Sequence, residues 1–298
     1  MTRTGFIAIV GKPNVGKSTL LNALLGEKIA IVSKKPQTTR TRITGILTEG
    51  EDQYVFLDTP GTHVPKTKLG EAMMRAVNET VSPGSCDAAL LVVDASDRPK
   101  SIEIGIAEKL KKSKIPAILV INKTDTVNAE RIGEAILEYS SLCDFVSVVP
   151  ISAMKNDGVD IIKKECASFL YESPWYFSED DITDQPERQI AAEIIREKLL
   201  RVLDDEIPHG TAVVIEDFRE GGKCLRIRAE IFCERESHKR IIIGKNGSML
   251  KTIGTYARED MEEFFGIKVF LDLWVKVKEN WRDSNFNISN FGLSNKDL

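Results

Sequence analysis

The octapeptide Gly11-Lys-Pro-Asn-Val-Gly-Lys-Ser18 limits the possible folds of this chain more than any other feature of its sequence. It matches the pattern G-x-x-x-x-G-K-[ST], and it stands between an apolar run at residues 6–10 and a helical stretch at residues 18–25. In this context the glycines allow consecutive backbone N–H groups to face phosphate oxygens at the N-terminus of a helix. We therefore expect a phosphate-binding loop that uses Gly11, Asn14, Val15, Gly16, Lys17, Ser18 and Thr19.

Short apolar runs alternate with amphipathic stretches from the N-terminus to about residue 170. Strands are expected near residues 6–10, 54–57, 88–93, 117–121 and 145–150, and helices near residues 18–25, 69–81, 102–112 and 129–140. Runs this short and rich in β-branched residues are typical of strands buried on both faces. The pattern predicts βαβ units, and hence an α/β domain with a mainly parallel sheet covered by helices.

A different order of elements follows the acidic, proline-containing stretch at residues 173–185. Helices are expected at residues 187–203, 237–243 and 248–265, and strands at residues 212–218, 225–232 and 269–277. This α-β-β-α-α-β order predicts a second, smaller α+β domain. We therefore divide the chain into a first domain at residues 1–172, a linker at 173–185, a second domain at 186–282 and a polar, loosely held tail at 283–298.

Charge and cysteine content exclude several classes of protein. The net charge of -4 over 298 residues argues against a broadly cationic nucleic-acid coat, so any contact with nucleic acid needs a local patch. The five cysteines include no Cys-x-x-Cys pair, which disfavours a disulfide framework and a zinc site. No apolar run approaches the ~20 residues that a bilayer span requires. We expect a cytoplasmic protein, and peripheral contact with a membrane stays open.

The tetrapeptide Asp58-Thr-Pro-Gly61 follows a predicted strand, which places a carboxylate near a metal ion and a glycine N–H near a γ-phosphate. Lys17 is expected to neutralise the β and γ phosphates, and the Ser18 hydroxyl to bind Mg²⁺. With Thr39, these residues give the expected metal ligands, which are Ser18, Thr39 and Asp58. The residues expected to act in hydrolysis are Lys17, Thr39, Asp58 and Gly61.

Gln37-Thr-Thr-Arg40 lies between these motifs in a polar stretch with few apparent burial constraints. Thr39, or with less support Thr38, can complete the Mg²⁺ shell while a γ-phosphate is present and release the metal after hydrolysis, which makes the segment a candidate switch. The alternative is a surface loop in which the threonines bond only the local backbone.

A second tetrapeptide, Asn122-Lys-Thr-Asp125, predicts the choice of base. An aspartate after a strand can accept hydrogen bonds from guanine N1–H and from the exocyclic amine that adenine lacks. Ser152 and Ala153 follow a further predicted strand, where a backbone N–H can reach guanine O6. We expect Asn122, Lys123, Asp125, Ser152 and Ala153 to bind the nucleotide, because open α/β sheets bind ligands at the carboxyl ends of their strands.

Thr62 stands where Ras-type GTPases carry the glutamine that orients the attacking water. Its presence predicts a slow intrinsic reaction or another catalytic route. His63 is a candidate for that route, but a solvated loop histidine is the favoured interpretation.

Together these motifs resemble the Era family of bacterial GTPases, as do Pro36-Gln-Thr-Thr-Arg40, the stretch from Arg188 to Leu199 and the stretch from Ile241 to Leu250. The resemblance covers nearly the whole chain apart from its last residues. It implies a Ras-like P-loop GTPase domain followed by a type II KH domain, with GTP or GDP and Mg²⁺ as ligands. It also implies binding to the 3′ end of 16S ribosomal RNA during 30S subunit assembly, and possible association with the inner membrane. Asn14 matches an asparagine that coordinates K⁺ in related GTPases.

The second domain carries a candidate RNA site of its own. Gly244-Lys-Asn-Gly247 lies between two predicted helices, as a G-x-x-G loop that clamps an RNA backbone does. The expected RNA-binding residues are Ile243, Gly244, Lys245, Asn246, Gly247 and Lys251; the alternative is a glycine-capped helix hairpin beside a core-facing isoleucine run. Trp274, Trp281 and the Lys276/Lys278 pair can extend an RNA surface, although one apolar face of the last strand is the favoured interpretation.

Two other functions remain possible at this point. GTP can be a structural ligand of an RNA-binding protein, or the chain can act on transfer RNA or on the 50S subunit, which the KH-like second half disfavours. We expect a monomer with no affinity for DNA.

Overall fold

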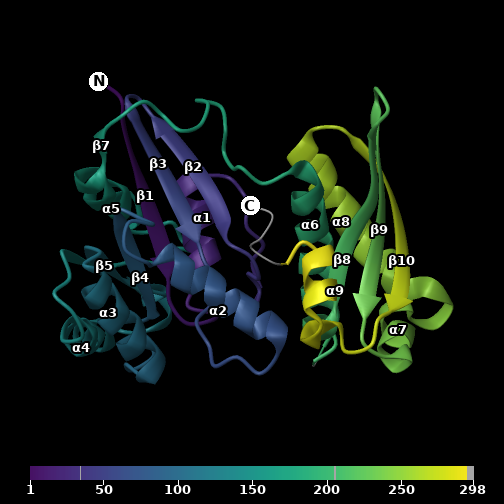
Figure 1. Ribbon diagram of the computed structural model, residues 1–298, viewed down its shortest axis with the longest axis horizontal. Coiled ribbons are helices and arrows are strands. Elements are labelled where there is room, and N and C mark those ends of the chain that lie inside the picture. Colours follow the sequence, from purple (N-terminus) through teal and green to yellow (C-terminus); the bar gives the residue numbers. More distant parts are fainter. Residues whose placement is uncertain (34, 205, 294–298) are drawn as a thin grey trace. The chain divides into compact units, whose positions relative to one another are not determined.

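The computed structural model describes residues 1–33, 35–204 and 206–293. Two compact units account for them, one formed by residues 1–66 and 70–184 and the other by residues 67–69 and 185 onward. The confirmed fold class is an α/β domain with a mainly parallel sheet, followed by a smaller α+β domain (Figure 1).

The first unit is built on a sheet with the strand order β2-β3-β1-β4-β5-β6, and β7 pairs with the start of β1. Neighbouring strands are parallel except for the β2–β3 and β1–β7 pairs. All seven residues of β4 are buried, as expected for a central strand covered on both faces. The strands are β1 (Arg3–Val10), β2 (Ile43–Glu49), β3 (Asp52–Asp58), β4 (Ala88–Asp94), β5 (Ala117–Asn122), β6 (Ser147–Pro150) and β7 (Tyr171–Glu172).

Helices cover both faces of this sheet. One face packs its apolar residues against α3 and α4, in a core that includes Leu91, Leu110 and Tyr139. On the other face α1 contacts α5 as well as β1, β2 and β3. The helices are α1 (Lys17–Leu25), α2 (Lys68–Thr80), α3 (Ser101–Ser113), α4 (Ala129–Ser140) and α5 (Val159–Cys166), with short 3₁₀ turns η1 (Thr124–Thr126) and η2 (Ala167–Phe169).

Residues 173–184 run along the first unit rather than standing free of it. The Ile46 N–H donates to Ile182 O at 2.9 Å, and the Thr183 hydroxyl donates to Thr44 O at 2.7 Å. The side chain of Gln53, which is fully buried, binds the backbone of Tyr176 and Phe177. This segment, which we call the strap, therefore satisfies backbone groups at the edge of β2.

The second unit has three strands in the order β10-β9-β8, with β9 antiparallel to β8 and parallel to β10. Helices α6, α7 and α8 pack on one face, around a core that includes Ile195, Ile231 and Met261. The predicted α-β-β-α-α-β order is confirmed. The elements are α6 (Glu187–Val202), η3 (Pro208–Gly210), β8 (Ala212–Glu220), β9 (Cys224–Cys233), α7 (Glu236–Ile243), η4 (Lys245–Gly247), α8 (Ser248–Phe265), β10 (Lys268–Val277), η5 (Trp281–Asp283) and α9 (Asn285–Asn290).

The prediction of a loosely held tail from residue 283 is wrong for residues 283–293; residues 294–298 lie outside the described part of the chain. Helix α9 buries Ile288, and the Phe291 ring stacks on Phe232 with ring centroids 4.6 Å apart. Trp281 is fully buried, and its indole N–H donates to Gly210 O at 2.9 Å. Three apolar side chains among polar neighbours are enough to anchor the segment, and composition alone did not reveal them.

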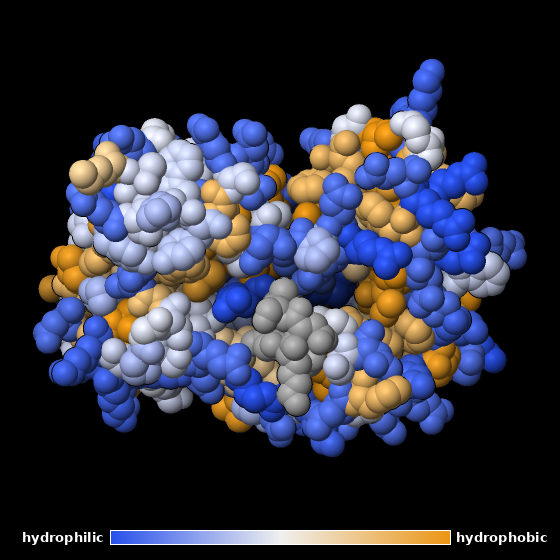
Figure 2. Space-filling model, turned by 45° about the horizontal axis from the view of Figure 1, so that its top comes forward, coloured by the Kyte–Doolittle hydropathy of each residue, from blue (hydrophilic) through white to orange (hydrophobic). Residues whose placement is uncertain are grey.

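No helix in the described part of the chain is long and apolar enough to cross a bilayer. On the face that Figure 2 shows, hydrophobic residues are scattered among hydrophilic ones.

Replacement of Trp281 by alanine tests the anchoring of this segment. The change leaves a large cavity and an unpaired Gly210 carbonyl, so we expect a loss of about 3–5 kcal/mol in the unfolding free energy. Urea denaturation followed by circular dichroism measures it. Trp274→Ala is the matched control, because that ring is 58% exposed and its loss should cost under ~0.5 kcal/mol. Equal effects of the two changes would contradict the assignment.

Candidate nucleotide-binding site

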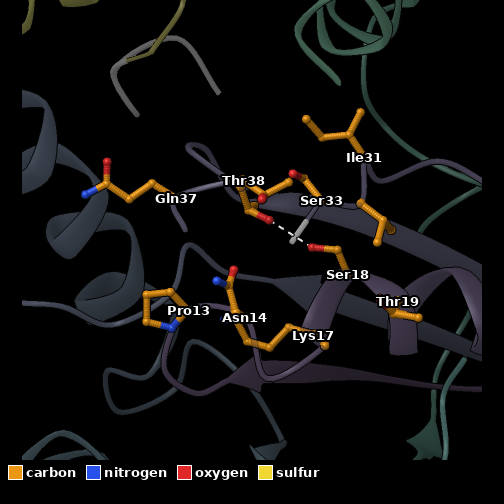
Figure 3. A pocket seen from close by; sticks show the side chains of 13 residues that line it. Pro13, Asn14, Lys17, Ser18, Thr19, Ile31, Ser33, Gln37 and Thr38 are labelled. Carbon is orange, nitrogen blue, oxygen red and sulfur yellow. Dashed lines mark hydrogen bonds between the residues drawn. The ribbon is translucent and has the colours of Figure 1, made fainter. Parts of the chain in front are cut away.

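The phosphate loop between β1 and α1 depends on two glycines. Gly11 has φ 152°, and a Cβ there would lie 2.3 Å from Val92 O. Gly16 has φ 97°, and a Cβ there would lie 2.3 Å from the Asn122 amide nitrogen. Both positions therefore exclude any larger residue. Figure 3 shows the pocket that this loop forms, with Asn14, Lys17 and Ser18 on the side opposite Thr38.

Lys17 lies inside the loop with its ammonium group pointing back to the backbone. Its Nζ donates to Gly11 O at 3.1 Å and to Lys12 O at 3.0 Å. Burial lowers the pKa of Lys17 to about 8, although the nearby Asp58 carboxylate raises it. A bound phosphate group would stabilise the charged form of Lys17 and offset the cost of its burial. The loop therefore positions a cation for binding an anion.

Two hydroxyl groups and one carboxylate lie together at the N-terminus of α1. The Ser18 hydroxyl lies 2.9 Å from the Thr39 hydroxyl, the contact drawn as the dashed line in Figure 3, and donates to Asp58 Oδ2 at 2.7 Å. The Thr39 hydroxyl is 3.5 Å from the same oxygen. The structure thus brings together the three predicted metal ligands from α1, β3 and the segment before β2.

The Asp58 carboxylate fits a divalent cation on physical grounds. The side chain is fully buried, and its Oδ1 atom has no hydrogen-bond partner among the described residues. Burial raises the pKa of Asp58 to about 6, despite Lys17 and the hydrogen bonds from Ser18 and Thr39. Oxygen donors of this kind suit Mg²⁺, which is usually held by one or two carboxylates together with phosphates and water. A Mg²⁺ site of this kind needs no histidine or cysteine ligand. Among the described residues, no group of three or more acidic, histidine or cysteine side chains could hold a metal ion.

The segment that carries Thr39 is more constrained than its polarity suggested. Thr39, Arg40 and Thr41 are all buried, which corrects the expectation of few burial constraints. The Thr38 hydroxyl instead donates to Lys35 O at 2.7 Å. The geometry therefore favours Thr39 over Thr38 as the metal ligand.

Gly61 packs directly on the phosphate loop. A Cβ at this position would lie 2.6 Å from Pro13 Cα, and the next residue, Thr62, donates its N–H to Gly11 O at 3.1 Å. His63 does not line the pocket. Its Nδ1 is 3.0 Å from Gly61 O, and its buried Nε2 has no partner among the described residues, so the favoured interpretation of a solvated histidine is wrong. The ring packs locally, against Gly70.

Asn122 joins the loops that are predicted to hold the phosphates and the base. Its amide nitrogen donates to Val15 O at 2.8 Å, and its Oδ1 accepts from the Ala153 N–H at 3.0 Å. Three loops from the ends of β1, β5 and β6 are therefore connected through one buried side chain.

Asp125 and Ser152 lie together, as the prediction for the base-binding residues requires. The Ser152 hydroxyl donates to Asp125 Oδ1 at 2.7 Å, which orients the carboxylate. Lys123, at φ 65°, forms an ion pair of 2.7 Å with Asp94 Oδ2. Burial opposes ionisation of Asp94, but hydrogen bonds from Lys123 and Ser96 lower its pKa. Both charged side chains of the motif are thus held in place, Asp125 by Ser152 and Lys123 by Asp94.

Nothing in the sequence indicated the role of Lys12 in positioning the phosphate loop. Its ammonium group lies 2.5 Å from Asp97 Oδ2 and 3.2 Å from Glu103 Oε1, and Glu103 is fully buried. These contacts connect the phosphate loop to α3 and to the loop before it. No sequence signal identifies this pairing, because the partners lie far away along the chain.

The predicted RNA loop has the backbone geometry of a close turn. Gly244 has φ 73°, and a Cβ there would lie 2.7 Å from Met249 Cβ; Asn246 has φ 51° and Gly247 φ 77°. A groove beside the loop is lined by Gly247, Leu250, Lys251, Gly254, Thr255, Arg258, Leu271 and Leu273. Of the six predicted RNA-binding residues, Gly247 and Lys251 therefore line this groove. Ile243, Gly244, Lys245 and Asn246 lie in or next to the loop itself.

The run of three isoleucines before the loop divides its side chains. Ile242 belongs to the core, Ile241 is 47% exposed and Ile243 is half-buried. Ile242 thus fits the interpretation as a core-facing run, whereas the exposed Ile241 does not.

The buried carboxylate predicts that stability depends on pH in the absence of nucleotide and metal. Asp58 has a pKa of about 6 when folded and an ordinary value of 3.8, so the folded chain keeps a proton that the unfolded chain releases, and stability falls as pH rises through that window. Asp58→Asn should therefore stabilise the chain by about 3 kcal/mol at neutral pH and much less near pH 4.

Urea unfolding in a chelator at the two pH values measures this difference. Asp160→Asn is the control, because that carboxylate is 66% exposed. An Asp58→Asn effect that does not change with pH would show that the carboxylate is not destabilised by burial.

Comparisons with known proteins agree with this geometry. A family model described as 50S ribosome-binding GTPase matches residues 6–123, and a KH domain model matches residues 206–282. The chain is 49% identical over 291 residues to GTPase Era of Ruminiclostridium cellulolyticum, covering 97% of each chain. It is 51% identical over 284 residues to GTPase Era of Caldanaerobacter subterraneus subsp. tengcongensis, covering 95% of each.

Two solved structures have the same architecture over nearly the full length. Era in complex with MgGDPNP and nucleotides 1506–1542 of 16S ribosomal RNA has a TM-score of 0.94 and 39% identity, covering 99% of this chain and 100% of that one. A point variant of Aquifex aeolicus Era bound to GDP and AlF4⁻ has a TM-score of 0.94 and 40% identity, covering 98% and 100%. The phosphate loop, the cluster of Ser18, Thr39 and Asp58 and the KH domain all lie within the aligned regions, and the chain belongs to the Era family of GTPases.

Proposed function

We propose that this GTPase uses its nucleotide state to control binding of the 3′ end of 16S ribosomal RNA to its KH domain during 30S subunit assembly. The observation that carries the proposal is the convergence of Ser18, Thr39 and Asp58. Thr39 comes from a segment separate from the phosphate loop, so its position depends on what occupies the metal site. A ligand that changes between GTP and GDP can therefore change this segment.

Each residue has a separate role in the proposed reaction. The Lys17 ammonium neutralises the charge that develops between the β and γ phosphates, and the loop amides around Gly16 orient them. Ser18, Thr39 and Asp58 would hold Mg²⁺, which supplies electrostatic stabilisation of the phosphates when bound. Gly61 keeps the backbone close to the γ-phosphate position. Because Thr62 cannot orient water as a glutamine does, we expect a slow intrinsic rate.

Three finer aspects belong to the same proposal. Asn14, at φ 64°, would contribute to a K⁺ site beside the phosphates. The protein would act as a monomer in the cytoplasm, with possible peripheral association with the inner membrane. These aspects rest on the family resemblance and on the composition of the chain.

The solved Era complex with nucleotides 1506–1542 of 16S ribosomal RNA supports the choice of RNA. The 50S description of the family model concerns residues 6–123 alone and does not extend to the KH domain. For that reason we favour the small subunit over the large subunit and over transfer RNA.

Asp125→Asn tests the assignment of the base. The amide loses two charge-assisted hydrogen bonds to guanine, so we expect GTP to bind about 100-fold more weakly or worse, while xanthosine triphosphate binds better than it does to the unchanged chain. Calorimetry with both nucleotides and with ATP measures the change. Asp157→Asn, on a neighbouring loop residue, is the control. Unchanged selectivity for GTP would show that another residue chooses the base.

A paired change in the KH loop tests the coupling. Gly244→Asp with Gly247→Asp adds bulk and negative charge where phosphates should approach, so RNA binding should be lost and GTP binding kept. Single-turnover GTP hydrolysis with and without a fragment spanning nucleotides 1506–1542 should show acceleration by RNA only in the unchanged chain. If neither protein hydrolyses GTP with or without RNA, GTP is a structural ligand and the switch proposal fails.

A further inference from the structure

The last strand of the second unit has two different faces. Leu271 and Leu273 line the groove beside the KH loop, on the side of β10 that packs against α8. Strand residues alternate between faces, so Phe270 and Trp274 lie on the opposite side. Their exposed fractions are 62% and 58%. Two large aromatic side chains are thus presented to solvent on the face of the sheet that carries no helix of the core, which we call the outer face.

Basic side chains surround these rings. The strand register places Arg226 beside Phe270, Arg228 beside Asp272 and Arg219 beside Arg226. The paired positions of the outer face carry five cations and three carboxylates on a chain whose net charge is -4, and the unpaired bulge residue Glu216 of β8 is exposed as well. The cations are Arg219, Arg226, Arg228, Lys268 and Lys276, and the carboxylates are Asp217, Glu230 and Asp272.

Four of the five cations form ion pairs, namely Arg219 with Asp217, Arg228 with Asp272, Lys268 with Glu262 and Lys276 with Glu230. The side chains of these cations nevertheless stay 54% to 79% exposed. Arg228 and Asp272 are 3.5 Å apart, with side chains 60% and 38% exposed. Pairs this exposed contribute little to stability, so breaking one to bind a phosphate costs little. Arg226 forms no ion pair or hydrogen bond within the described part of the chain.

The aromatic rings are available as well. Neither Phe270 nor Trp274 has a ring contact with another described residue. The Trp274 indole N–H donates to Asp272 Oδ2 at 3.0 Å, which restricts the orientation of the ring. By contrast, the aromatic residue at the other end of the outer face, Phe232, is covered by Phe291. The anchored C-terminal segment covers one aromatic side chain of this face and leaves two open.

We propose that the outer face is a second RNA-binding surface, on which unpaired bases stack on Phe270 and Trp274 while Arg226 and Arg228 bind phosphates. Any base has a π-face, so such stacking needs no particular sequence. The proposal rests on RNA binding by the KH loop and extends the same RNA path. Since β10 is an edge strand, no further strand separates the groove on one of its sides from the rings on the other.

The spacing of the rings favours RNA over a membrane. Four strand residues span about 13 Å, so each ring takes a separate base. Asp272 lies between the rings along the strand and interrupts the apolar surface that the two rings would otherwise form. Insertion of both rings into a bilayer would bring that carboxylate to the headgroups, whereas stacked bases leave it in water.

Affinity measurements test the surface. Phe270→Ala and Trp274→Ala should each weaken binding of a fluorescent fragment spanning nucleotides 1506–1542 of 16S ribosomal RNA by about 5- to 100-fold. Trp274→Phe should keep most of the affinity, because it keeps a stacking ring. Phe286→Ala is the matched control, since that ring is 72% exposed on α9 and should leave RNA binding unchanged.

A spectroscopic measurement reports on the ring directly. In a Trp175→Phe background, Trp274 is the exposed indole and Trp281 the buried one. The RNA fragment should reduce acrylamide quenching of the exposed indole at least about twofold, whereas a mere structural role of Trp274 would leave the quenching unchanged.

The outcomes separate this inference from the proposed function. If the paired KH-loop change removes RNA binding and the double change Phe270→Ala/Trp274→Ala does not, the outer face is not an RNA surface and the KH assignment stands. If the unchanged chain does not bind the fragment, both fail. If the double change keeps RNA binding but abolishes sedimentation with phosphatidylglycerol-containing vesicles, the face binds a membrane and the RNA proposal is overturned.

Discussion

The side chain of Asn122 is the constraint on which the arrangement of the nucleotide site depends. It binds the backbone of Val15 in the phosphate loop and the backbone of Ala153 in the base loop, with both hydrogen bonds buried. Buried amides have few alternatives when a partner moves, so these loops hold one relative position. The same nitrogen leaves no room for a side chain at Gly16. The Asn122 side chain therefore connects the phosphate loop to the base loop and requires a glycine at position 16.

Charge burial shows that the site is arranged for its ligand and not for the stability of the empty chain. The shifts in pKa of Lys17 and Asp58 run in opposite directions, and both disfavour the charged form. An anion beside the lysine and a cation beside the aspartate would each reverse the cost. Binding of nucleotide and metal thus offsets the free-energy cost of burying these two charges, so the ligands stabilise the folded chain. Binding sites often lower the stability of the empty protein in this way.

Sequence reasoning predicted most of the fold because its main signals are local. The strands and helices around the phosphate loop have distinct periodicities, and the α-β-β-α-α-β order of the second unit followed from the same patterns. The edge strand β2 and the helix α5 were missed, since Ile43–Glu49 mixes apolar, polar and glycine residues and Val159–Cys166 is short. The Lys12 ion pairs and the burial of Trp281 depend on residues distant along the chain, which single-sequence patterns do not reveal.

The strap has a consequence for communication within the chain. Thr39 lies just before β2, and the first residues of β2 bind the strap through Thr44 and Ile46. The strap ends where the second unit begins, at Gln185. One bonded route from the predicted metal ligand Thr39 to the start of the second unit therefore runs through two hydrogen bonds at a sheet edge. An insertion in the strap would displace these two hydrogen bonds, so insertions there should be tolerated less well than in other surface connections.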